Sequence, residues 1–255
     1  PSAVGESLEP MVRRVLGSLD EALESLSNLK ELRRGVVRVA APETLSCTLM
    51  PELIAMYNAR HPGVDVRFED VPIERVVAGV EDGSTDIGFG PARVAVDDTV
   101  DVHALWADPL RVALRADDPL AGGESVSWRD LRDRPLINYM PNFAINVLSQ
   151  LPPRNHPRQL VPVHRVNTAL SMLRVRQGAV VCPSMAEPLV HGFGLRFLPL
   201  VQPQVNWKIA LFIRRGGSLS PAVDSFLHYT LELARNWVAF GREAQLAGET
   251  VVRAA

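Results

Sequence analysis

The clearest candidates for chemistry in this sequence are small polar side chains where an apolar run gives way to the start of a helix. Thr44 and Ser46 come shortly after the mostly apolar residues 36–40, and Asn142 and Phe143 follow a second apolar run. The first N–H groups of a helix lack partners within it, and the helix dipole places positive charge beside them. Such a helix start can bind an anion. Each pair can instead serve only to cap its helix and to pack in the core. Anion binding and this structural role both stay open.

Residues for catalysis or metal binding are not grouped in this sequence. It contains no G-x-S-x-G, G-x-x-x-x-G-K-[ST], H-E-x-x-H, C-x-x-C or G-x-G-x-x-G motif. The six histidines have no partner at the spacing of metal ligands, which favours structural or surface roles. Cys47 and Cys182, the only cysteines, each lie near the end of an expected strand. Packing is favoured for them over a redox role, which requires a thiol of lowered pKa. We expect no enzyme activity, no metal and no cofactor.

The composition is that of a globular protein whose charges nearly balance. Of 255 residues, 47% are hydrophobic, and the formal net charge is −2. This length suffices for one large or two small domains, and the charge balance argues against a basic nucleic-acid-binding surface. No apolar run is long enough to cross a bilayer, and no signal peptide is recognisable. Because the chain begins with Pro1 instead of Met, we expect further residues upstream.

Residues 6–33 are expected to form one long helix. Its apolar residues recur at alternating steps of four and three: Leu8, Val12, Val15, Leu19, Ala22, Leu26 and Leu29. This spacing is typical of a coiled-coil seam. It predicts a linker and dimerisation helix over 1–34, although a helix packed on its own domain remains the alternative.

Two α/β units follow this helix. Strands at 36–40, 64–68 and 86–90 alternate with helices that end near 60 and 81, which predicts a parallel sheet with right-handed crossovers. After a strand at 110–114, the second unit has strands near 136–139, 161–166 and 179–182, with helices at 143–150 and 168–177. A strand-like run over 205–214 and a helix over 220–240 end the pattern. Two crossings between the units predict two hinged lobes with a ligand cleft between them.

The chain resembles the LysR-type transcriptional regulators without their DNA-binding domain, over nearly all of its length. The similarity rests on Gly5-Glu-Ser-Leu8 before the heptad helix, Leu32 to Ala40, Leu49-Met-Pro51, Arg60 to Val64, Glu81 to Gly88 and Asp118-Pro-Leu120. A departure is Gly178 to Pro183, where the family usually has a second glycine, so that helix–strand packing there is expected to differ.

The resemblance implies an α/β, two-lobed, periplasmic-binding-protein-like (type 2) effector domain behind a linker helix. It implies a first lobe over 36–115 plus 213–240, a second lobe over 116–212 and a tail over 241–255. It further implies a cytoplasmic protein with an upstream winged helix-turn-helix for operator DNA, self-association into dimers and tetramers, contact with RNA polymerase and no membrane partner. The effector contacts that it implies are Thr44, Leu45, Ser46, Phe89, Pro91, Pro141, Asn142 and Phe143.

We therefore hypothesise that a small organic acid binds between the lobes, with its anionic group at the helix start of Thr44 to Ser46 and the loop at Asn142 closing on it. A solute-binding receptor of a transporter shares the fold and is the alternative, although the heptad helix argues against a monomeric receptor. An enzyme on the same fold has only the cleft in its favour, because no nucleophile and base are paired.

Overall fold

A computed structural model describes residues 12, 17, 35–94, 96–140 and 142–247 of the chain. The linker helix expected over 1–34 therefore lies outside the described residues, except for Val12 and Gly17. The strands are β1 (Gly35–Ala41), β2 (Val64–Asp70), β3 (Ile87–Pro91), β4 (Val100–Leu114), β5 (Val126–Ser127), β6 (Pro135–Asn138), β7 (Gln159–Pro162), β8 (Val180–Pro183), β9 (Arg196–Val201) and β10 (Asn206–Arg214). The α-helices are α2 (Glu43–Thr48), α3 (Met50–Arg60), α4 (Ile73–Asp82), α5 (Trp128–Leu131), α6 (Phe143–Asn146), α7 (Val166–Val175), α8 (Glu187–Gly192) and α9 (Pro221–Ala247). The 3-10 helices of the described residues are η1 (Pro119–Gly122), η2 (Leu148–Gln150), η3 (Pro153–Asn155) and η4 (Ser184–Ala186).

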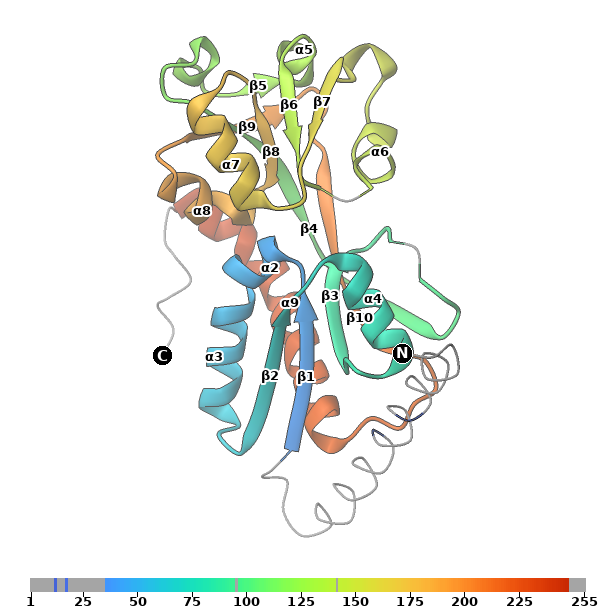
Figure 1. Cartoon of the computed structure of the whole chain (residues 1–255). Helices are drawn as coiled ribbons and strands as arrows, with labels where there is room; N and C mark the ends of the chain where they lie inside the picture. The colour runs from blue at the N-terminus through green and yellow to red at the C-terminus, as the bar shows by residue number, and fades with distance from the viewer. Residues whose placement is uncertain (1–11, 13–16, 18–34, 95, 141, 248–255) are drawn as a thin grey trace.

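The first lobe is built on a sheet in the order β2-β1-β3-β10-β4. β1 pairs in parallel with β2 and β3, which confirms the predicted β-α-β-α-β unit. Strand alternation sends Val37 and Val39 into a core that also holds Phe226 of α9, while Ala40 packs with Val76 of α4 on the opposite face. Helices therefore cover both faces of the sheet, as parallel strands require (Figure 1).

β4 passes from the first lobe into the second. Up to Pro109 it pairs antiparallel with β10, and from Leu110 onward it pairs with β8 and β9. The sequence pattern predicts a strand only over 110–114. Residues 100–109 show no strand pattern, because Asp101, His103 and Asp108 interrupt their apolar residues. Near the crossing, Asp108 accepts hydrogen bonds from the Ser184 hydroxyl (2.6 Å) and the Met185 amide (3.0 Å) of the second lobe. Burial raises the pKa of Asp108, and these hydrogen bonds offset part of that rise.

The second lobe groups β5 to β9 around the end of β4 (Figure 1). β6 and β7 are parallel, and a bridge between Leu136 and Ala179 sets β6 beside β8. Its core gathers Leu170 of α7 against the sheet. β4 changes its pairing partner from β10 to β8 and β9 between Pro109 and Leu110, and β10 pairs with β4 from Asn206 onward. The lobe boundaries expected at 115 and 213 stay a prediction.

Helix boundaries correct three expectations. Thr44 and Ser46 do not cap their helix: the N-cap of α2 is Pro42, and no side chain caps it. The expected helix over 143–150 is shorter, because α6 ends at Asn146 and a separate 3-10 turn follows. α9 continues to Ala247, past the expected end at 240. No helix of the described part of the chain is long and apolar enough to cross a membrane.

Candidate functional site

A cavity of about 430 Å³ lies between the two lobes. Its walls come from the segments that follow β1, β2 and β3 in the first lobe and β6, β7 and β8 in the second, together with β10. The lining residues are Pro42, Glu43, Thr44, Leu45, Asp70, Val71, Pro72, Ile73, Glu74, Pro91, Asn138, Tyr139, Met140, Pro162, Val163, His164, Arg165, Val166, Pro183, Met185 and Trp207. Carboxyl ends of parallel strands meet at one edge of a sheet, where α/β proteins commonly bind ligands.

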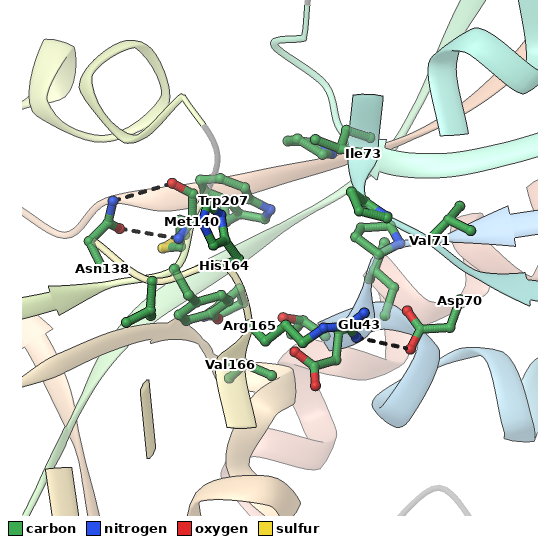
Figure 2. A pocket seen from close by; sticks show the side chains of 18 of the residues that line it. Glu43, Asp70, Val71, Ile73, Asn138, Met140, His164, Arg165, Val166 and Trp207 are labelled. Carbon is green, nitrogen blue, oxygen red and sulfur yellow. Dashed lines mark hydrogen bonds and ion pairs between the residues drawn. The ribbon is translucent and has the colours of Figure 1, made fainter. Parts of the chain in front are cut away.

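Much of the lining is apolar. Ile73 of the first lobe and Met140 of the second are buried, and the indole of Trp207 is also buried at 8% exposure. Figure 2 shows Trp207 beside Met140, with Ile73 on the other wall. The volume and these side chains fit a small organic molecule, because ligand pockets combine apolar walls with a few placed polar groups.

The lining residues Glu43 and Asp70 each make a polar contact across the cleft. The amide of Asn167 on α7 donates a hydrogen bond to Oε1 of Glu43 on α2 at 2.9 Å. The guanidinium of Arg165 lies 3.8 Å from the carboxylate of Asp70 (Figure 2). The Arg165 and Asp70 side chains are 55% and 39% exposed. Because solvent screens such a pair, it stabilises this arrangement of the two lobes by less than about 1 kcal/mol. The hydrogen bond of Glu43, which is more shielded, is the stronger link.

Two side-chain oxygen atoms of the described lining residues are buried without a hydrogen-bond partner. They are Oε2 of Glu43 and the hydroxyl oxygen of Tyr139, one from each lobe. Burial holds the pKa of Tyr139 well above its usual value of 10; neighbouring Cys182 adds to the rise, and the side chain of Thr44 beside the hydroxyl opposes it. A buried polar atom without a partner costs free energy, which a ligand with a matching donor or acceptor would recover.

Neither cysteine has the environment of a reactive thiol. Cys182 is fully buried in the second-lobe core, and burial raises its pKa to about 12. Cys47 is exposed, and its pKa is also raised, chiefly by partial burial and then by the carboxylates of Glu43 and Asp70. Since the thiolate is the reactive form, these surroundings favour the packing interpretation for Cys182.

The first-lobe residues expected at the site divide between the cavity and the core. Thr44, Leu45 and Pro91 line the cavity. Ser46 does not line it; its hydroxyl contacts the carbonyl oxygens of Ala41 and Pro42 at 3.0 and 3.1 Å and the Asp70 carboxylate at 3.2 Å. Phe89 is fully buried in the core and is absent from the lining.

The expected second-lobe contacts are not brought to the cavity. Phe143 packs in the core at 5% exposure, and Asn142 is an exposed residue in the left-handed region, with φ 50°. Its side chain makes no capping hydrogen bond, and four-residue α6 offers no long helix dipole. Pro141 lies outside the described residues. The wall is formed instead by the residues just before this segment, from Asn138 to Met140.

Two segments of the cavity wall were not among the expected site residues. They are Asp70 to Glu74 after β2, and Pro162 to Val166 after β7. Asp70 to Glu74 follows a predicted strand and leads into a predicted helix, as Thr44 does, so the same pattern indicates it. The second segment is hidden by a wrong strand boundary: the sequence predicts a strand near 161–166, whereas β7 ends at Pro162.

Comparisons with known proteins agree with this architecture. Residues 30–235 match the family described as LysR substrate binding domain. An uncharacterised HTH-type transcriptional regulator of Escherichia coli, YbhD, is 24% identical over 232 residues, covering 90% of this chain and 73% of YbhD. The HTH-type transcriptional regulator BenM of Acinetobacter baylyi is 22% identical over 208 residues, covering 79% of this chain and 67% of BenM.

Solved structures give the same fold. The effector binding domain of QuiR in complex with shikimate matches with a TM-score of 0.71 and 16% identity, over 80% of this chain and 98% of that domain. CbnR, a LysR family transcriptional regulator, matches with a TM-score of 0.72 and 17% identity, over 91% of this chain and 81% of its own. The two-lobed, periplasmic-binding-protein-like fold expected from the sequence is confirmed. With the family match spanning most of its length, this chain belongs to the LysR substrate-binding-domain family.

Proposed function

We propose that this chain is the effector-sensing and oligomerisation module of a LysR-type transcriptional regulator, and that a small organic effector binds in the cavity between its lobes. The observation that carries the proposal is that the cavity is walled by strand ends from both lobes and flanked by the Glu43–Asn167 hydrogen bond. A ligand held there touches both lobes at once. It therefore has different affinities for different lobe arrangements, which is the requirement for a ligand to shift a conformational equilibrium.

The proposed output is DNA binding by a winged helix-turn-helix domain upstream of this chain. Relatives such as YbhD and BenM are named HTH-type regulators, which supports this part of the proposal. In it, the segment over 1–34, which the sequence predicts as a dimerisation helix, pairs two copies, and effector domains associate into dimers and tetramers. A change of lobe arrangement then alters the spacing of the DNA-binding domains. Contact with RNA polymerase and a cytoplasmic location belong to the same proposal.

For the lobes themselves we propose boundaries that follow the strand pairing. The first lobe takes residues 35–109 together with the chain from 206 through α9, and the second takes 110–205. Two crossings between the lobes then lie side by side, at the middle of β4 and between β9 and β10. Such paired connections suit a hinge. The transporter-receptor alternative is not favoured, because the matching family is that of LysR regulators.

The proposal is tested by blocking the cavity. Thermal-shift and calorimetric screens of small organic acids against the purified chain identify a binder, and Thr44→Trp then fills the cavity from the first-lobe wall. Val175→Trp adds the same side chain at an 81% exposed position on α7 and is the matched control. We expect Thr44→Trp to abolish binding and Val175→Trp to leave it unchanged. Unchanged binding to Thr44→Trp would place the ligand elsewhere and refute the site.

A further inference from the structure

The charged side chains that line the cavity are sorted by lobe. Among the described lining residues, the first lobe contributes only carboxylates: Glu43, Asp70 and Glu74. The described part of the second lobe contributes the guanidinium of Arg165 and the imidazole of His164. We call the first-lobe side of the cavity, with these three carboxylates, the acidic wall. The helix start at Thr44, where the sequence led us to expect an anion, lies on this wall.

Charge on the acidic wall is only partly compensated by the protein. The guanidinium of Arg165 lies 3.8 Å from Asp70, while Glu43 has the neutral amide of Asn167 on one oxygen and no partner on the other. Three carboxylates thus face one permanent cation among the described lining residues. A ligand whose only polar group is an anion would add to this excess and leave Oε2 of Glu43 without a donor, which opposes its binding.

We propose that the effector is a zwitterion of the amino acid class, with an ammonium group on the first-lobe wall and a carboxylate on the second. This inference rests on the proposed function, since it concerns the same cavity. The ammonium group donates to Glu43 and Asp70, and the carboxylate pairs with Arg165. The ligand thus replaces the Asp70–Arg165 ion pair by two new ones: its ammonium group with the first-lobe carboxylates, and its carboxylate with Arg165. No charged side chain on either wall therefore loses its counterion.

The local geometry permits this exchange. Arg165 is more than half exposed, so its guanidinium can turn from Asp70 to a ligand carboxylate. Glu43 lines the cavity, and rotation about the terminal torsion of its side chain, which has a broad minimum, adjusts the carboxylate to an ammonium group in exchange for the hydrogen bond of Asn167. The apolar side group of the ligand then lies against Ile73, Met140 and Trp207.

Matched probes test which charges are recognised. Isothermal titration calorimetry of the purified 255-residue chain is run with L-phenylalanine, its deaminated analogue 3-phenylpropanoate and its decarboxylated analogue 2-phenylethylamine. A second set uses L-leucine, 4-methylpentanoate and 3-methylbutylamine. We expect the zwitterion of at least one set to bind about tenfold or more tightly than both of its analogues, since each analogue lacks one of the two ion pairs.

Charge-removing variants assign each group to its wall. Glu43→Gln should weaken the amino acid about tenfold and leave the acid analogue unchanged or tighter. Arg165→Gln should weaken the amino acid by a similar factor and leave the amine analogue unchanged. Glu52→Gln on α3 and Arg158→Gln after η3 remove the same charges at exposed positions outside the cavity and are the controls, with no change expected.

The outcomes separate this inference from the proposed function. If an acid binds as tightly as its amino acid and Thr44→Trp abolishes both, the ammonium site is refuted while the effector cavity stands. If the amino acid binds and Thr44→Trp has no effect, both fail. Absence of binding by all six probes overturns the zwitterion inference, and the acid screen still tests the cavity.

Discussion

The hydrogen bond between Glu43 and Asn167 is predicted to couple the two lobes energetically. Asn167→Ala removes the only donor that contacts the Glu43 carboxylate among the described residues, an N–H···O bond of 2.9 Å between α7 and α2. A hydrogen bond to a charged group contributes about 1.5–3 kcal/mol to stability. Glu43 is only partly buried and can regain water when the bond is lost, so we expect a coupling of about 1–2 kcal/mol.

A double-mutant cycle measures this coupling. The free energy of urea unfolding is determined for the parent chain, Glu43→Ala, Asn167→Ala and the double variant, at one protein concentration because self-association is linked to stability. The cycle cancels the gain in helix propensity that alanine brings to α7. Exposed Glu52 and Thr168, which do not line the cavity, provide a control cycle with no expected coupling. A coupling of about 0.3 kcal/mol or less for Glu43 and Asn167, within the usual additivity error, would refute the reasoning.

Three further predictions concern the thiols, the second-lobe loop and one glycine. At pH 8, iodoacetamide should modify exposed Cys47, whereas buried Cys182, with a pKa of about 12, should react only after denaturation; rapid labelling of native Cys182, read by mass spectrometry, would contradict its packing. Phe143→Ala should lower the free energy of unfolding by about 3–5 kcal/mol because it empties a core position, whereas Asn142→Gly should cost nothing, since Asn142 has φ 50°. Equal effects of these two substitutions in urea melts would show that Phe143 is not core. Gly178→Ala should cost about 1–3 kcal/mol, because Gly178 has φ 155° and a Cβ would lie 2.7 Å from a carbonyl oxygen of β6; an unchanged melting temperature would argue against that close approach.

The first lobe could be predicted closely because its local signals agree. Apolar strands, amphipathic helices and stops such as Gly83, which adopts φ 80° after α4, all indicate the same β-α-β-α-β order. β4 was found only over 110–114, because the residues before Pro109 mix polar and apolar side chains. Their strand conformation depends on pairing with β10, which is far away in the sequence. Long-range pairing leaves little trace in local composition.

The candidate site could be predicted in its position but not in its chemistry. Thr44 lies just after β1 and Pro91 is the last residue of β3, and a rule about strand ends places both correctly at the cavity. Phe143 also follows a strand, but an apolar residue at a helix start suits the core as well as a ligand, and only packing decides. The Asp70–Arg165 pair joins two segments whose proximity exists only in the folded chain. The acidic character of the first-lobe wall could therefore not be predicted from the sequence.

Hydrogen–deuterium exchange tests the central claim, a ligand held by both lobes, most directly. The chain is compared with and without a saturating concentration of the tightest binder among the six matched probes and the screened acids. Our account predicts slower exchange in residues 70–75 of the first lobe and in residues 163–168 of the second, both of which border the cavity. Slower exchange in only one of these segments, or only at a surface remote from both, would contradict it.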